Sequence, residues 1–224
     1  MERKTKLETE ELYHIYNRGV EKRKIFQNSS EYKRFLVLLY IANNDQPLHI
    51  KDFGSIPIEE IFRQNRGKPL VAIGAYCLMP NHFHLLITPL VDGGISKFML
   101  KLQTGYSMYF NKKNERVGPL FQGTFKSSHI ADDLYLKYIY SYIHLNPAKL
   151  KNPNWKTQSK SFLSQLKNFI AKYPYSSLQE YISSNYKIIN PKLFPVEKED
   201  IIDYKSIIDD FSEFPEDNPR EGFD

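Results

Sequence analysis

Residues 70–88 read LVAIGAYCLMPNHFHLLIT. Two apolar runs, residues 70–79 and residues 82–88, are separated only by Pro80 and Asn81, which are typical of a tight turn. Short apolar runs bounded by turn residues favour β-strands. The stretch therefore predicts a β-hairpin, around which the other predicted elements can be arranged.

A strand and a helix are predicted ahead of this hairpin. Residues 12–19 alternate between apolar and polar side chains, as a half-buried strand does, and the run ends at a glycine. Ser29 or Ser30 is predicted to be the N-cap of a helix that continues to about Asn44.

Three more elements are predicted after the hairpin. They are an amphipathic helix over residues 94–114, a strand over residues 121–130, and a helix that Asp132 caps and that stops near Pro147. The order strand, helix, strand, strand, helix, strand, helix matches a split βαβ, ferredoxin-like layout. We therefore expect an α+β fold with helices packed on one face of an antiparallel sheet, plus a C-terminal helical extension.

The chain is predicted to form one main domain with appendages. The main domain is expected over residues 1–150, with a Pro- and Gly-containing insertion at residues 45–69. Residues 151–191 are expected to be a helical extension of the same domain, and residues 192–224 an acidic tail.

The charge of the chain is unevenly distributed. The net charge is +5, but residues 192–224 carry 11 acidic and 4 basic side chains, which leaves a balance of +12 on residues 1–191. A basic body favours a polyanionic partner, although a basic surface alone is common. The single cysteine, Cys77, excludes an intrachain disulfide. Without an apolar signal segment or a run long enough to span a membrane, we expect no membrane association and a cytoplasmic location.

Two histidines at the start of the second hairpin strand form the first candidate site. His82 and His84 are two residues apart, so in a strand their imidazoles lie on one face. Two imidazoles on one face are able to share a metal ion. Taken alone, this short pattern favours two histidines satisfied by hydrogen bonds.

A stripe on the last predicted helix forms the second candidate site. Tyr138, Tyr142 and Asn146 recur every four residues, so a helix aligns them on one side. If Asn146 contributes its amide oxygen to a metal ion, Tyr142 lies beside the same ion. A tyrosine has an ordinary pKa of about 10 and needs activation to act as a nucleophile. The two sites together suggest metal-assisted phosphodiester cleavage by a tyrosine, while spacing alone favours an aromatic stripe that faces the core.

Five motifs in a fixed order carry a resemblance to a known family. They are YHIYNRG at residues 13–19, MPNHFHLL at 79–86, GPLFQG at 118–123, YIHLNPAK at 142–149 and YPYSS at 173–177. In this combination the chain resembles the REP-associated tyrosine transposases, which belong to the single-tyrosine HUH nuclease superfamily.

The resemblance implies a function and assigns roles to the candidate residues. His82, His84 and Asn146 would hold Mg²⁺ or Mn²⁺, and Tyr142 would attack a phosphate of single-stranded DNA to give a 5′-phosphotyrosine and a free 3′-hydroxyl. Rejoining by that hydroxyl or another would transfer the strand. Related enzymes prefer DNA that folds into hairpins, so the expected partner is single-stranded or hairpin DNA, bound by a monomer or a homodimer. Thr124 stands where a basic residue is expected, so DNA contacts there do not carry over.

Basic side chains near the predicted site are the candidates for DNA contact. Phe121 and Tyr175 are candidates for stacking on unpaired bases, and His14 and His144 are given no role. Two other functions remain open: a catalytically silent protein that binds structured nucleic acid, and a metal-dependent hydrolase that uses water instead of Tyr142. The predicted phosphate contacts are Arg18, Lys112, Lys113, Arg116 and Lys126.

Overall fold

The computed structural model describes residues 7–46 and 56–202 of the chain. Its sheet has four antiparallel strands in the order β2-β3-β1-β4. The connection from β1 through α1 to β2 leaves room for β3 between them, which is the split βαβ arrangement. The predicted α+β, ferredoxin-like fold is therefore confirmed. The strands are β1 (Leu12–Arg18), β2 (Val71–Met79), β3 (His82–Pro89) and β4 (Lys126–Ile130).

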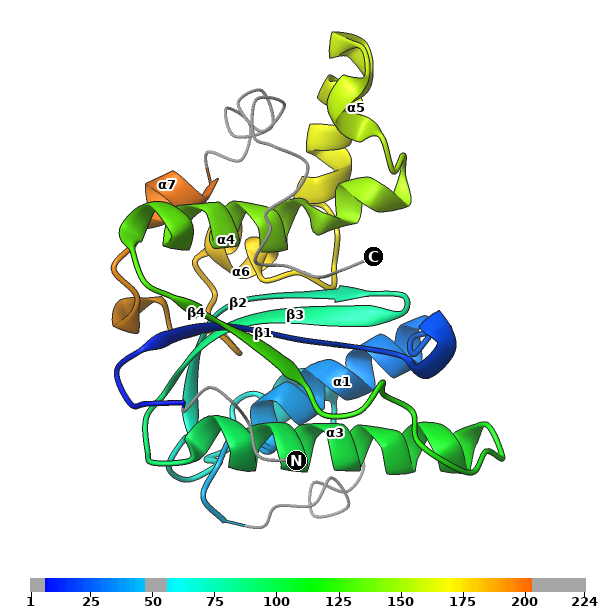
Figure 1. The fold of residues 1–224 in the computed structure, drawn as a ribbon, viewed down its shortest axis with the longest axis vertical. Helices are drawn as coiled ribbons and strands as arrows, with labels where there is room; N and C mark the ends of the chain where they lie inside the picture. The colour runs from blue at the N-terminus through cyan, green and yellow to red at the C-terminus, as the bar shows by residue number, and fades with distance from the viewer. Residues whose placement is uncertain (1–6, 47–55, 203–224) are drawn as a thin grey trace.

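Helices α1 (Ser29–Ile41) and α3 (Gly94–Lys113) cover one face of the sheet (Figure 1). Phe83 of β3 meets Phe35 of α1 with 5.1 Å between the ring centres, and both side chains are fully buried. Asn28, and not either of the two serines that follow it, caps α1, because its side chain accepts a hydrogen bond from the backbone of Glu31. The cap is thus one or two residues earlier than predicted.

The opposite face is covered by α4 (Asp133–Leu145) and α6 (Leu178–Ser183) (Figure 1). Asp132 caps α4 as predicted, since its carboxylate accepts a hydrogen bond from the backbone of Tyr135 at 2.7 Å. The expected layout had helices on one face only, and α1 and α3 do share one face. α4 and α6, which follow β4, cover the other face, so the sheet has helices on both sides. The space between α4 and the sheet holds the candidate site.

The segment after α4 also closes one edge of the sheet. The backbone N–H of Leu78 donates to the carbonyl of Tyr175 at 2.9 Å, and the backbone N–H of Ser177 donates to the carbonyl of Tyr76 at 3.0 Å. These bonds pair backbone groups on the outer edge of β2, where another strand could otherwise bind. The remaining elements are η1 (Val20–Lys22), α2 (Ile58–Ile61), η3 (Asn146–Leu150), η4 (Trp155–Thr157), α5 (Lys160–Ala171), η5 (Pro191–Leu193) and α7 (Lys198–Ile202).

The strand predicted over residues 121–130 is shorter than expected, because β4 begins only at Lys126. Phe121 forms an isolated bridge with Gly19, and Gly123 has a φ of +71°, which interrupts an extended chain. Residues 47–55 of the predicted insertion and residues 203–224 of the predicted tail lie outside the described residues. Within the part of the chain that the structure describes, none of the helices has the length and apolar character needed to cross a bilayer.

Candidate active site

β3 brings His82 and His84 to the sheet face that α4 covers. Their ring centres are 5.0 Å apart, which confirms the prediction that both imidazoles share a face. In the antiparallel register His82 lies opposite Arg18 and His84 lies opposite Tyr16 of β1. Directly opposed residues project on the same side of a sheet, so β1 also contributes to this site.

Each of the two histidines has its Nδ1 atom engaged by a neighbour. Nδ1 of His82 lies 2.6 Å from Oδ1 of Asn81, an oxygen that can only accept a hydrogen bond. Nδ1 of His84 lies 2.9 Å from Nε2 of His14. A metal-binding histidine ordinarily uses one nitrogen for the metal and the other for such a partner. The pattern therefore presents Nε2 of both imidazoles as the atoms for coordination.

Both imidazoles are held in the neutral form. The pKa of His82 is lowered to about 4, first by burial and then by the positive charges of Lys149 and Arg18, although Asn146 opposes this shift. Burial, followed by the neighbouring imidazoles of His82 and His14 and the charge of Lys149, holds the pKa of His84 well below its ordinary value. Neutral imidazole is the form that binds a metal ion, so no proton has to be displaced near neutral pH.

α4 brings the predicted nucleophile to the same place. The ring of Tyr142 lies perpendicular to that of His84 with 5.2 Å between centres, and it stacks on Tyr138 at 6.1 Å. Asn146, one turn later, donates from Nδ2 to the carbonyl of Tyr142 at 3.2 Å. Its Oδ1 atom is buried and accepts no well-formed hydrogen bond among the described residues, while Asn146 lies close enough to His82 to raise the pKa of that imidazole. A buried amide oxygen beside a histidine suits a metal ligand, since a poorly satisfied buried acceptor is costly.

The ligand set fits a divalent ion only if Asn146 takes part. Within residues 7–46 and 56–202, no group of three or more His, Cys, Asp or Glu side chains could hold a metal ion. His82, His84 and Asn146 together supply two neutral nitrogens and one neutral oxygen. Such a set leaves positions for water and phosphate oxygens.

Positive side chains face this group from two directions. Arg18 sits opposite His82 in the sheet, and its Nε atom is buried without a hydrogen-bond partner among the described residues. The Nζ atom of Lys149 lies 5.6 Å from the centre of the Tyr142 ring. Two cations beside two neutral imidazoles make the site attractive to a phosphate.

The five predicted DNA contacts fall on two sides of the molecule. Lys126 lies opposite Tyr16 in the register of β1 and β4, so it projects on the same sheet face as His84, as Arg18 does. Lys112, Lys113 and Arg116 lie instead at the far end of α3, and Lys113 is paired with the buried carboxylate of Glu31 at 2.9 Å.

The two aromatic rings considered for base stacking are occupied by the protein itself. Phe121 is 6% exposed. The ring of Tyr175 stacks on that of Tyr32 with 3.8 Å between centres. Phe121 is therefore part of the core, which contradicts the suggestion that it stacks on bases. Tyr175 is only partly buried, and one face of its ring is covered by Tyr32, so stacking on a base stays a prediction for Tyr175.

Two residues of this site were not predicted from the sequence. His14 follows the alternation of β1, but its contact with His84 depends on how β1 and β3 are aligned, which the local sequence does not fix. Lys149 stands in the motif that begins at Tyr142, yet it reaches the site only because the chain continues from α4 directly into η3, which begins at Asn146. His144, by contrast, points away, with its Nε2 atom 2.8 Å from the hydroxyl of Ser177.

Comparisons with known proteins were made for sequence and for structure. A family model described as "Transposase IS200 like" matches residues 11–146, which is more than half of the chain. No curated protein sequence matches. A solved structure titled "Structure of the REP associates tyrosine transposase bound to a REP hairpin" is similar over 84% of this chain and 89% of that chain, at 12% identity and a TM-score of 0.49. A likeness at this identity and score says nothing about the activity of this chain.

Proposed function

The chain belongs to the IS200-like transposase family, and from this membership we propose that it is a single-stranded DNA endonuclease and strand transferase that cuts through Tyr142. The observation that carries the proposal is the meeting of α4 with β3. Tyr142 and Asn146, one helical turn apart, come together with His84, whose ring centre is 5.2 Å from that of Tyr142. A nucleophile and a ligand set on adjoining elements are what phosphodiester cleavage by a tyrosine needs.

His82, His84 and Asn146 would hold the divalent ion, which we propose to be Mg²⁺ or Mn²⁺. Their fit rests on the two engaged Nδ1 atoms, on the lowered pKa of both imidazoles and on the buried Oδ1 of Asn146. When bound, such an ion supplies polarisation of a phosphoryl oxygen and stabilises negative charge during transfer.

The covalent step belongs to Tyr142. Its phenolic oxygen forms a bond to phosphorus, the bond from phosphorus to the 3′ oxygen breaks, and the phenolic proton is lost while the leaving 3′ oxygen gains one. The product is a 5′-phosphotyrosine and a 3′-hydroxyl. Attack by a 3′-hydroxyl on this phosphotyrosine reverses the bonding and joins the strands without an external energy source. We propose that Arg18, opposite His82 in the sheet, and Lys149, near the ring of Tyr142, bind the phosphate oxygens throughout.

We propose that the substrate is single-stranded DNA that includes a hairpin. The resemblance of the five motifs to the REP-associated tyrosine transposases supports this substrate, and the positive balance of residues 1–191 suits a polyanion. Arg18 and Lys126, on the same sheet face as His84, would contact the backbone close to the cut.

The test is formation of a covalent adduct with hairpin-bearing single-stranded DNA in the presence of Mn²⁺. We expect DNA labelled at its 3′ end to become attached to the protein and to remain attached under denaturing conditions. Tyr142→Phe should form no adduct, because the attacking oxygen is gone. Tyr138→Phe is the matched control, since it removes a hydroxyl from the neighbouring ring on the same helix and should still form the adduct.

Each other outcome identifies a different function. An adduct formed by Tyr142→Phe would remove Tyr142 as the nucleophile. Cleavage by Tyr142→Phe without an adduct, lost in His82→Ala, would indicate a hydrolase that uses water. DNA binding with neither an adduct nor cleavage by the unmodified protein would indicate a binding protein.

A further inference from the structure

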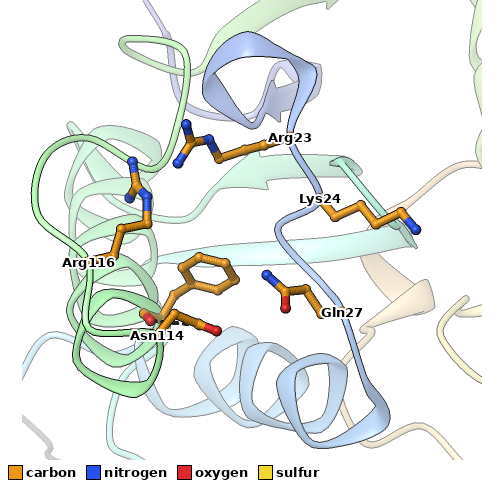
Figure 2. Close-up of a pocket in the computed structure, with 6 residues that line it drawn as sticks. Arg23, Lys24, Gln27, Asn114 and Arg116 are labelled. Atoms are coloured by element: carbon orange, nitrogen blue, oxygen red, sulfur yellow. Dashed lines mark hydrogen bonds between the residues drawn. The ribbon is translucent and has the colours of Figure 1, made fainter.

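A cavity on another side of the molecule has the composition of a nucleotide-binding pocket. It has a volume of about 410 Å³, which lies in the range of about 300–1,000 Å³ for small-molecule sites. One wall is the segment between β1 and α1, and the other is the end of α3 (Figure 2). We call it the flank pocket, and its lining residues are Arg23, Lys24, Gln27, Phe110, Asn114 and Arg116.

The lining of the flank pocket combines the groups that bind an unpaired nucleotide. Three cationic side chains suit phosphate oxygens, and the amides of Gln27 and Asn114 suit the edge of a base. In Figure 2 the side chain of Gln27 points into the space between the two walls. Phe110 itself is only 2% exposed and belongs to the core, so the cationic and amide side chains are the groups that can contact a ligand.

Two guanidinium groups at one end of the flank pocket are held in place by the protein. Arg116 donates to Oδ1 of Asn111 at 2.7 Å and to the carbonyl of Pro119 at 2.9 Å. Arg23 donates to the carbonyl of Val20 at 3.2 Å. A guanidinium has five N–H donors, so these bonds fix each group and leave donors for a ligand. Groups that are already ordered lose less entropy on binding.

The wall of the flank pocket formed by the segment between β1 and α1 is hydrogen-bonded to the turn that precedes β3, the strand that carries the two histidines. The backbone of Ile25 donates to the carbonyl of Pro80 at 2.8 Å, and that of Gly19 donates to Asn81 at 2.8 Å. Pro80 and Asn81 form the turn from which β3 starts at His82. A DNA strand that leaves the candidate active site around this turn would therefore meet the flank pocket.

We propose that the flank pocket binds one unpaired nucleotide of the single-stranded DNA that flanks the cleaved phosphate. This inference rests on the proposed function for the identity of its ligand, but it concerns different residues. The pocket would hold the strand on one side of the cut while the groups around Tyr142 hold the phosphate that is cut. It would thereby add affinity for unpaired DNA and not for a duplex.

The test measures binding of two labelled DNAs without divalent metal, so that no cleavage occurs. One is an oligothymidine of about 15 nucleotides, and the other is a blunt hairpin without single-stranded flanks. Arg23→Ala removes a phosphate contact, whereas Gln27→Trp fills the pocket without a change of charge. We expect each variant to bind the oligothymidine roughly five- to tenfold more weakly and the blunt hairpin as before. Arg23→Ala should also lower the salt dependence of binding, while Gln27→Trp should not.

The control is Arg63→Ala. Arg63 pairs with the nearby Glu60 at 2.8 Å, much as Arg23 pairs with Glu21 at 2.8 Å, but it lies near α2. Its loss should leave both affinities unchanged. Thermal unfolding reports whether each variant is folded. If Arg23→Ala is destabilised, the binding result for Gln27→Trp tests the pocket on its own, because Gln27 is exposed and its substitution should not disturb the fold.

Failure of this inference can be told apart from failure of the proposed function. The proposed role of the flank pocket would be wrong if both variants bound the oligothymidine as tightly as the unmodified protein does, or if they lost as much affinity for the blunt hairpin as for the oligothymidine. Neither result would bear on adduct formation by Tyr142. If instead no adduct forms but oligothymidine binding still depends on Arg23 and Gln27, the nucleotide-binding role of the pocket is supported and the proposed cleavage activity is wrong.

Discussion

At the scale of single residues, the candidate site depends on the hydrogen bonds that each imidazole makes at Nδ1, the nitrogen that does not face the proposed metal ion. Asn81 holds Nδ1 of His82 and His14 holds Nδ1 of His84. His82 and His84 share a face in any strand, because the side-chain period of a strand is two, and so the sequence could predict this pair. The partner His14 could not be predicted in the same way, because it is 70 residues away from His84 and depends on strand register.

Loss of His14 should weaken metal binding while the fold is kept. Without its imidazole, His84 is no longer fixed in the orientation that presents Nε2, and we expect His14→Ala to lower the affinity for Mn²⁺ by about 10- to 100-fold. Calorimetric titration of the protein with Mn²⁺ measures this. His129→Ala is the control, since His129 pairs with Glu11 at 2.6 Å and projects on the other sheet face. Equal Mn²⁺ affinity in His14→Ala and the unmodified protein would show that His14 does not orient the ligand.

At the scale of elements, α4 shows what a local pattern can and cannot predict. The interval of four between Tyr142 and Asn146 places them on one side of any helix, whatever surrounds it. Which side faces β3 depends on the burial of Ile139 and Ile143. That packing involves distant residues, so spacing alone favoured an aromatic stripe that faces the core. In the structure Tyr142 is half-buried against the core, as a core-facing stripe would be, and it also lies beside His84, as a nucleophile at this site would.

α6 is anchored by a buried carboxylate. Oε2 of Glu180 accepts backbone N–H bonds from Lys187 at 2.6 Å and Ile188 at 3.0 Å, and Oε1 accepts the hydroxyl of Tyr76 at 3.0 Å. Burial raises the pKa of Glu180 above its ordinary value of 4.5, and the hydrogen bonds oppose this only in part. The folded protein therefore holds this proton to a higher pH than the unfolded chain does.

The stability of the protein should depend on pH through Glu180. Because the unfolded chain releases the proton first, the contribution of Glu180 to the free energy of unfolding is complete below about pH 4.5 and falls as the pH rises through the raised pKa. Glu180→Gln keeps an acceptor for the backbone and cannot ionise. We expect the stability of this variant, relative to the unmodified protein, to rise between about pH 4.5 and about pH 7.

Urea unfolding at the two pH values measures this difference. Glu59→Gln is the control, because the carboxylate of Glu59 is 65% exposed. Its substitution should shift stability by a similar small amount at both pH values. Parallel pH profiles for Glu180→Gln and the unmodified protein would contradict the assignment.

At the scale of the whole molecule, distant parts of one chain meet across the sheet. The layout of strands and helices could be predicted because each element has a clear local pattern, and the basic character of the body followed from composition alone. The flank pocket could not be predicted, since it forms only where the segment before α1 approaches the end of α3. Arg116 lines this pocket and had been predicted as a DNA contact from its positive charge. Gln27 also lines it, but nothing in the sequence near Gln27 indicates a ligand-binding role.

The convergence of α4 and β3 within a single chain has a consequence for mixed populations. Two defective copies, one His84→Ala and the other Tyr142→Phe, would not rescue each other, because neither holds a complete set of groups. Mixing the two purified variants should yield no DNA adduct, and two such alleles in one cell would fail to complement. Recovery of adduct on mixing would mean that copies exchange α4. An inactive copy would also leave an active neighbour unharmed, except by competing with it for DNA.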